Sequence, residues 1–192
     1  MKVIGTVGQN GSGKDEVLKY LKARYDVPFF STGDMVREIA AQEGAEPTRD
    51  NLRAISERYF REQGEGCFVR LLAERLRHDA APVVGISGIR SLKDVQILRE
   101  VFRDAFVLIN VSVSDPHQRY ERMVKRAEER DPQQYEQFLM QDKAEEALFH
   151  ITEAGEQADY TIGNDGSLSD LHEAIDRLVS DKGILRHEKD RE

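Results

Sequence analysis

Short apolar runs alternate along the chain with longer segments whose apolar residues recur every three or four positions. A buried strand of a parallel sheet is a short apolar run, and an amphipathic helix repeats its apolar residues with a period near 3.6. The expected strands are residues 3–7, 27–30, 83–86, 106–111 and 160–162. Strands that alternate with helices predict an α/β fold, with a mostly parallel sheet covered on both faces.

The helical patterns divide the rest of the chain. The expected helices are residues 17–25, 35–40, 52–60, 68–76, 95–102, a long charged region at 116–154, and 171–179. No internal repeat or low-complexity linker interrupts this series, so we expect one domain over residues 1–182. The tail at 183–192 is highly charged, with only Ile184 and Leu185 apolar, and we expect it to be frayed.

Composition narrows the class of protein. The 192 residues carry 28 Lys+Arg against 36 Asp+Glu, a net charge of −8, which argues against general binding to nucleic acids or membrane surfaces. A single cysteine, Cys67, excludes an intrachain disulfide and a cysteine-rich zinc site. No apolar run approaches the roughly 18 residues of a membrane span. With no secretory apolar segment at the start, we expect a cytoplasmic protein.

The strongest chemical signal lies at residues 8–15, G-Q-N-G-S-G-K-D. It matches the pattern G-x-x-x-x-G-K between an expected strand and an expected helix, which is where a phosphate-binding loop (P-loop) belongs. Its backbone N–H groups and the following helix N-terminus would bind phosphates, and Lys14 would reach the β and γ phosphates. The expected ATP-binding residues are Gly8, Gln9, Asn10, Gly11, Ser12, Gly13, Lys14 and Asp15.

Position 15 departs from the usual motif. The residue after the lysine is ordinarily Ser or Thr, whose hydroxyl binds Mg²⁺, and here it is Asp15. A carboxylate beside a triphosphate is repelled unless a divalent cation lies between them, so Asp15 is a candidate Mg²⁺ ligand. The alternative is a carboxylate at a helix start that points away from the phosphates.

A second motif, F-S-T-G-D-M-V-R, covers residues 30–37. By itself it is a capped helix start, with Thr32 or Asp34 as the cap. It resembles the S-T-G-D-M-x-R segment of adenylate kinases, which binds the acceptor nucleoside monophosphate. The resemblance implies that Thr32, Gly33 and Arg37 bind the acceptor. Asp34 either caps the helix or serves catalysis by orienting the acceptor or acting as base, the latter for a hydroxyl acceptor.

Two further segments extend the resemblance. Residues 85–91, G-I-S-G-I-R-S, resemble the strand-three segment of such kinases, which implies that Arg90 reaches a phosphate of the acceptor. Residues 164–168, N-D-G-S-L, resemble a segment of dephospho-CoA kinases near the donor base, which implies ATP-binding roles for Asn164 and Gly166.

Residues 1–180 are thus similar to a P-loop kinase-like family related to adenylate kinase and dephospho-CoA kinase. The implied fold is a three-layer P-loop NTPase of the nucleoside monophosphate kinase type, with a five-stranded parallel sheet. The implied acceptor-binding region lies at about 33–80 and the lid at about 115–150.

Ser87 stands where the related kinases have an aspartate that belongs to the magnesium and acceptor site. Because position 15 has gained a carboxylate while position 87 has lost one, we expect the two residues to have exchanged roles in holding Mg²⁺. The competing interpretation is weakened metal binding and lost catalysis.

Four arginines follow one face of the expected lid helix, at positions 119, 122, 126 and 130. In phosphoryl-transfer enzymes such guanidinium groups stabilise the charge that spreads over the transferred phosphoryl group. The resemblance singles out Arg122 and Arg126 for catalysis beside Lys14. The alternative is a solvated face, and solvated faces are also the expectation for the acidic stretches at 128–131 and 142–146.

The expected function is an ATP-dependent, Mg²⁺-dependent small-molecule kinase. Its partners would be ATP and a nucleotide-like acceptor, either a nucleoside monophosphate or the ribose 3′-hydroxyl of dephospho-CoA, and it would be a monomer or homodimer. The alternative is a nucleotide-binding regulatory protein with weak or lost kinase activity.

Overall fold

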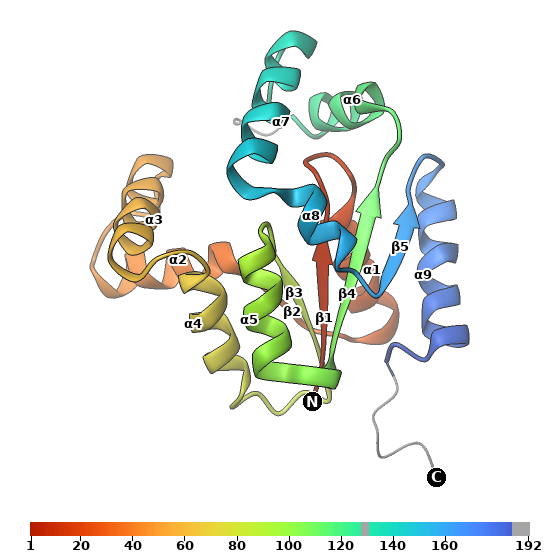
Figure 1. Ribbon diagram of the computed structural model, residues 1–192, viewed down its shortest axis with the longest axis horizontal. Coiled ribbons are helices and arrows are strands. Elements are labelled where there is room, and N and C mark those ends of the chain that lie inside the picture. Colours follow the sequence, from red (N-terminus) through yellow and green to blue (C-terminus); the bar gives the residue numbers. More distant parts are fainter. Residues whose placement is uncertain (128–130, 186–192) are drawn as a thin grey trace.

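The five apolar runs form the five strands of one parallel sheet in the computed structural model, which describes residues 1–127 and 131–185. The strand order is β2-β3-β1-β4-β5 (Figure 1). The strands are β1 (Lys2–Val7), β2 (Phe29–Ser31), β3 (Val83–Ser87), β4 (Phe106–Ser112) and β5 (Tyr160–Gly163). The expected five-stranded parallel sheet is therefore confirmed.

Helices cover both faces of the sheet. They are α1 (Lys14–Tyr25), α2 (Thr32–Gln42), α3 (Arg49–Gln63), α4 (Cys67–Leu76), α5 (Leu92–Phe102), α6 (Pro116–Arg126), α7 (Tyr135–Phe149), α8 (Ile151–Glu156) and α9 (Leu168–Lys182), with a short 3₁₀ turn at Arg103–Ala105. Among the described residues, none of these helices is both long and apolar enough to cross a membrane.

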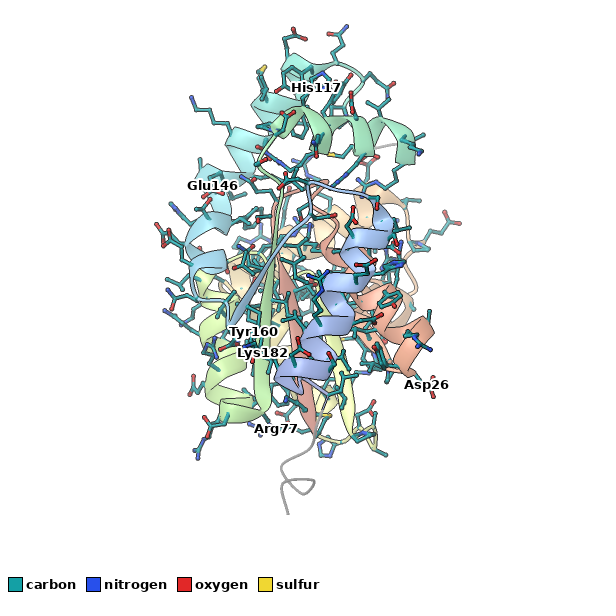
Figure 2. The ribbon with its side chains drawn as sticks, turned by 90° about the vertical axis from the view of Figure 1, so that its right-hand side faces the viewer. Asp26, Arg77, His117, Glu146, Tyr160 and Lys182 are labelled. Atoms are coloured by element: carbon teal, nitrogen blue, oxygen red, sulfur yellow. The ribbon has the colours of Figure 1, made fainter. Side chains whose placement is uncertain are left out.

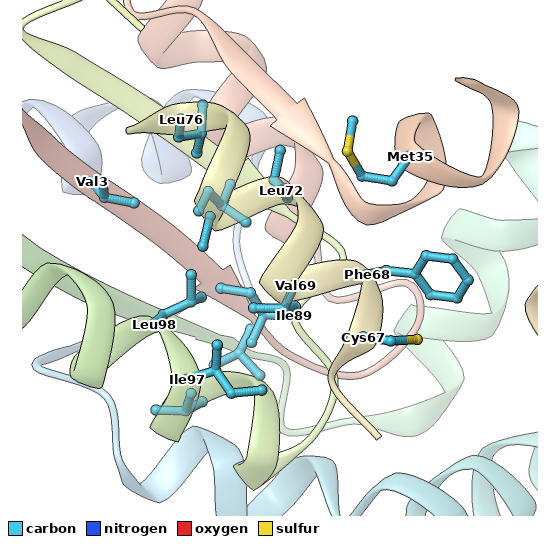
Figure 3. Packing of buried hydrophobic residues seen from close by; sticks show 14 of the residues in the cluster. Val3, Met35, Cys67, Phe68, Val69, Leu72, Leu76, Ile89, Ile97 and Leu98 are labelled. Carbon is cyan, nitrogen blue, oxygen red and sulfur yellow. The ribbon is translucent and has the colours of Figure 1, made fainter. Parts of the chain in front are cut away.

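Apolar side chains that alternate in direction along the strands form two hydrophobic clusters, one on each face of the sheet. Val3 of β1 joins the cluster under α4, α5 and α8, whereas its neighbour Ile4 joins the cluster under α1 and α9. Successive side chains of a strand point to opposite faces, so a continuous apolar run serves both clusters. Figure 3 shows the first cluster, in which Leu72 of α4 and Leu98 of α5 lie close to the sheet.

The central position of β1 brings the candidate site together. It pairs with β3 on one side and β4 on the other, so the carboxyl ends of the strands meet at one edge of the sheet. In Figure 2 the labelled His117 of α6 and Glu146 of α7 lie at one end of the molecule, far from Arg77. Ligands of open parallel sheets bind at the carboxyl ends of the strands.

The long helical region expected at 116–154 is confirmed in its helical character, but it consists of three helices, α6, α7 and α8. It is broken at Ala127 and at His150, whose φ angles of 54° and 50° are left-handed. Pro132 lies between the first break and α7, and proline disfavours a helical conformation in the residue before it. The expected helix from Arg119 to Arg130 therefore ends at Arg126, and Arg130 lies outside the described residues.

The expectation of a frayed tail from residue 183 is also wrong at its start. Ile184 is 1% exposed and belongs to the cluster under α1 and α9, and Leu185 packs against the same cluster. Gly183 ends α9 in a left-handed conformation that turns the chain back toward this core. The rest of the tail, residues 186–192, lies outside the described residues.

Candidate nucleotide and acceptor site

The P-loop connects β1 to α1 through a series of left-handed glycines. Gly11 has φ 77°, and a Cβ atom there would lie 2.5 Å from the Arg119 carbonyl oxygen. Gly13, with φ 93°, is the N-cap of α1, and a Cβ there would lie 2.5 Å from the Asn164 amide nitrogen. Both positions need glycine because the loop is packed between α6 and the segment after β5.

Lys14 begins α1 beneath this loop. Its ammonium donates a 3.4 Å hydrogen bond to the Gln9 carbonyl. Burial lowers the pKa of Lys14; Asp15 and Glu145 oppose that shift, while Arg90 and Arg126 add to it. A buried ammonium on which two guanidinium groups also act favours an anion as its partner, as phosphate binding requires.

Asp15 and Ser87 lie in direct contact. The Ser87 hydroxyl, 7% exposed at the end of β3, donates to Asp15 Oδ1 at 2.5 Å. A carboxylate and a hydroxyl are oxygen ligands of the kind that Mg²⁺ prefers, and Mg²⁺ takes its other ligands from phosphates and water. The described residues contain no group of three His, Cys, Asp or Glu side chains that could hold a metal alone. The pair therefore fits Mg²⁺ only together with bound phosphates.

The second motif starts α2 with a capping box. The Ser31 hydroxyl accepts from the Asp34 N–H at 3.1 Å, and Asp34 Oδ2 accepts from the Ser31 N–H at 2.8 Å. The expectation of Thr32 or Asp34 as N-cap is therefore wrong, and Asp34 is instead the reciprocal partner at the third helical position. Its other oxygen, Oδ1, accepts from Arg37 at 2.9 Å.

A cleft of about 790 Å³ opens beside this helix start. Thr32, Gly33 and Arg90 contribute to its lining, and Thr32 donates a 3.3 Å hydrogen bond to the carbonyl of Gly88, another lining residue. Arg37 is not among the lining residues; its side chain is 58% exposed and paired with Asp34. The structure thus brings three of the four expected acceptor residues into one cleft.

Aromatic side chains form much of the cleft wall. Phe60 of α3, Phe68 of α4 and Phe149 of α7 all line it, and Phe60 and Phe68 contact each other edge to face. The Arg90 guanidinium lies 5.5 Å from the centre of the Phe149 ring. The cleft therefore combines flat apolar surfaces with a cation that also influences Lys14.

The lid arginines of α6 have different partners. Arg119 is buried and forms a bidentate pair with Asp142 of α7, at 2.6 and 2.7 Å, while donating to the Asn10 carbonyl at 3.2 Å. Arg122 donates to the Asn164 carbonyl at 2.7 Å. Arg126 pairs with Asp131 at 2.6 Å. The three arginines on this face of α6 therefore contact three different parts of the protein.

The segment after β5 supports the P-loop from below. The buried Asn164 amide donates to the Ser12 carbonyl at 2.8 Å, and the Gly166 carbonyl lies 3.5 Å from Arg122. Asp165 accepts from the N–H and the hydroxyl of Ser114, and these bonds lower the pKa of Asp165. Asn164 therefore contacts the P-loop through the Ser12 carbonyl, and the carbonyls of Asn164 and Gly166 contact Arg122.

Three acidic residues were missed by the sequence patterns. Asp131, Asp142 and Glu145 are not solvated side chains, because Asp131 and Asp142 pair with arginines and Glu145 Oε2 accepts from the Asn10 amide at 2.7 Å. Asp142 and Glu145 are three residues apart and share one face of α7. The three-residue spacing of Asp142 and Glu145, in a segment that follows an arginine-rich helix, is the sequence signal that could have predicted these contacts.

Comparisons with known sequences identify a matching family model and relatives that cover most of this chain. Residues 7–138 match a family model described as an AAA domain. A UPF0200 protein from Thermococcus onnurineus is 35% identical over 187 residues, which cover 96% of this chain and 100% of that protein. A UPF0200 protein from Pyrococcus abyssi is 35% identical over 179 residues, covering 92% and 95%.

Solved structures with the same fold are more distant in sequence. A shikimate kinase from Acinetobacter baumannii, in complex with shikimate, is 19% identical with a TM-score of 0.54, covering 95% of this chain and 94% of that one. A gluconokinase from Sinorhizobium meliloti is 17% identical with a TM-score of 0.57, covering 97% and 98%.

Proposed function

The chain belongs to the UPF0200 protein family and has the α/β fold of small-molecule P-loop kinases, and from this premise we propose that it transfers the γ-phosphoryl group of ATP to a small nucleotide-like acceptor. One observation carries the proposal. Arg90 lines the acceptor cleft and also influences the buried Lys14 of the P-loop. A single cation thus serves both sides of a transferred phosphoryl group.

The residues of the chain divide the reaction between them. The P-loop backbone, the N-terminus of α1 and Lys14 bind the donor phosphates. Asp15 and Ser87 would hold Mg²⁺, which when bound neutralises charge on the β and γ oxygens. Arg126 influences Lys14 from α6 and is assigned to the phosphoryl group, whereas Arg122 holds the segment after β5 at the donor side.

The cleft favours a base-bearing acceptor over a polyhydroxylated acid. Phe60, Phe68 and Phe149 offer flat apolar surfaces, on which a nucleobase stacks favourably. A polyhydroxylated acid would instead require hydrogen-bonding groups around most of its surface, since an unpaired hydroxyl is costly to bury. Thr32 and Arg90 then place the acceptor phosphate at the P-loop side of the cleft.

A phosphate acceptor is favoured over a hydroxyl acceptor by the state of Asp34. Both of its carboxylate oxygens are engaged, one with the Ser31 N–H and the other with Arg37. A phosphate oxygen is already anionic and needs no base, while an alcohol would need one. This observation ranks nucleoside monophosphates ahead of dephospho-CoA.

An acceptor panel with γ-labelled ATP tests the proposal. The panel contains AMP, CMP, UMP, dTMP and dephospho-CoA, with shikimate and gluconate as polyhydroxylated controls, and Lys14→Ala as the inactive control enzyme. We expect label on a nucleoside monophosphate. Label only on a polyhydroxylated acid contradicts the assignment of the acceptor. Tight ATP binding with no labelled acceptor favours the alternative, a regulatory nucleotide-binding protein.

A further inference from the structure

Asn10, in the middle of the P-loop, is held from two sides by the pair of helices α6 and α7. Its carbonyl accepts from Arg119 of α6 at 3.2 Å, and its side-chain amide donates to Glu145 of α7 at 2.7 Å. Asp142, one turn before Glu145, links α7 to α6 directly through its bidentate pair with Arg119. The conformation of the P-loop and the position of α7 are thus directly connected.

The contact made by Glu145 is unusual because it places a negative charge at a site for negative ligands. The loop and the helix start that it adjoins present backbone N–H groups that bind phosphate oxygens. The charge of Glu145 also acts on Lys14, the side chain expected to meet the β and γ phosphates. Nucleotide phosphates and the Glu145 carboxylate therefore repel each other when both are near the loop.

The same helix reaches the acceptor cleft one turn later. Leu148 and Phe149 are three and four residues after Glu145, so they follow it on the same side of α7. Both line the cleft, and Phe149 contacts the guanidinium of Arg90. A movement of α7 at Glu145 must therefore change the wall of the acceptor cleft.

We propose that Glu145 is an anionic placeholder for the nucleotide, which holds α7 on the P-loop until phosphates displace it and thereby reposition Leu148 and Phe149 in the acceptor cleft. The proposal rests on the proposed function in two respects, that the P-loop binds a nucleotide and that the cleft binds the acceptor. It makes Glu145 a positioning residue that couples occupation of the donor site to the shape of the acceptor site. The acceptor then meets its final cleft only after the donor has bound.

Substitution Glu145→Gln removes the charge and keeps an oxygen that can accept from Asn10. Calorimetry with ADP and with a non-hydrolysable ATP analogue should show affinity raised roughly tenfold, the size of effect expected for removing one nearby like charge at a partly buried site. Glu136→Gln, the same change on an exposed residue in the first turn of α7, should leave affinity unchanged.

A fluorescent reporter measures the second half of the proposal. The chain contains no tryptophan, so Leu148→Trp, at a position that is 68% exposed, provides a single emission signal in the cleft wall. We expect the analogue to shift this emission in the Leu148→Trp protein and in its Glu136→Gln derivative. In a Glu145→Ala derivative, which has no oxygen to accept from Asn10, the emission should already resemble the nucleotide-bound value and change little.

The outcomes separate the two proposals. If the unsubstituted protein binds neither nucleotide, both the proposed function and the placeholder role are overturned. If it binds them and either Glu145→Gln matches it in affinity or Glu145→Ala matches it in emission response, the placeholder role alone is overturned. Weaker binding by Glu145→Gln also overturns it, since that result makes Glu145 a contributor to nucleotide binding.

Discussion

At the scale of single residues, Asp15 and Ser87 make the candidate metal site of this protein unusual. A P-loop ordinarily supplies a hydroxyl directly after its lysine, and here the hydroxyl comes from β3 and bonds to the carboxylate that replaced it. The expected exchange of roles needs these two side chains to be neighbours. In the structure the Ser87 hydroxyl oxygen lies 2.5 Å from Asp15 Oδ1. The part of both residues in metal binding stays a prediction.

Asp15→Ala should raise the magnesium concentration needed for tight ATP binding by tenfold or more, on the order of the loss of one charged ligand. Ser87→Ala should have a smaller effect, because a neutral hydroxyl contributes less than a carboxylate. The measurement is a calorimetric titration of ATP at several magnesium concentrations. Glu16→Ala, at the next residue of α1, is the control, and an undiminished magnesium dependence in Asp15→Ala would rule out the exchange.

Lys14 illustrates a conflict between stability and function. Because burial lowers the pKa of its ammonium, the charged form is costly in the nucleotide-free protein. Lys14→Met should increase the free energy of unfolding by about 1–2 kcal/mol while reducing phosphoryl transfer at least a hundredfold, on the order reported for single charge-stabilising groups. Urea unfolding and the labelled-ATP assay give the two values.

The pH dependence of unfolding checks the same interpretation. An amine whose pKa is lowered by folding binds its proton less tightly in the folded state, so stability rises with pH between the folded pKa and the ordinary value of 10.5. The Lys14→Met variant should lack this increment. Equal pH profiles for the two proteins would mean that Lys14 carries no such cost.

The glycine-rich pattern predicted the place of the P-loop and Lys14 between a strand and a helix, and the family resemblance predicted Arg90 at the acceptor site, because both rest on short motifs with fixed local geometry; the roles of these residues stay predictions. Neither the pattern nor the resemblance predicted the Asn10–Glu145 contact, which joins residues 135 positions apart. Its existence depends on the direction in which α7 leaves α6, and no periodicity encodes that direction. Arg37 failed to reach the cleft for a local reason, since Asp34 lies one turn before it and pairs with it.

At the scale of elements, α6 and α7 behave as one unit with a buried ion pair at its centre. The side chains of Arg119 and Asp142 are 3% and 17% exposed, and the Arg119 guanidinium lies 5.2 Å from the ring centre of the buried Phe138. Phe138 in turn stacks on Tyr135 at the start of α7. These contacts fix the two helices to each other and, through Asn10, to the P-loop.

Arg119→Met should destabilise the protein by about 3–5 kcal/mol, because it leaves the Asp142 carboxylate without its partner. Adding Asp142→Leu should restore much of that loss, since two apolar groups of similar size can replace a buried pair. Urea unfolding of both single variants and the double variant gives the coupling energy. Additive losses in the double variant would show that the pair contributes little.

Helix boundaries were the least predictable part of the fold. Ala127 and His150 adopt left-handed conformations although neither is a glycine, so the residue that most often ends a helix in this way marks neither break. The strands were predictable because each is a short apolar run bounded by polar or glycine residues.

At the scale of the whole molecule, the net charge of −8 does not describe the local charge around the P-loop. Arg90 and Arg126 are close enough to act on Lys14, although acidic residues outnumber basic ones in the chain as a whole. A local cluster of cations attracts a small anion at short range, and the surrounding negative charge repels long polyanions.

ATP binding should therefore weaken with salt despite the negative net charge. Raising sodium chloride from about 50 mM to about 500 mM should reduce affinity roughly tenfold, because the local attraction is screened. Lys14→Met should show a shallower salt dependence. Calorimetry at matched magnesium concentrations checks this expectation, and affinity that increases with salt would show that the net charge dominates instead.

The support of the P-loop by Asn164 has a consequence for synthesis on the ribosome. The loop leaves the ribosome early, but the amide that bonds to its Ser12 carbonyl belongs to a residue 152 positions later. A growing chain therefore carries an incomplete phosphate site through most of translation. Nascent chains that end before β5 should neither retain nucleotide nor gain protection from proteases when it is added, so nucleotide can stabilise only a nearly finished protein.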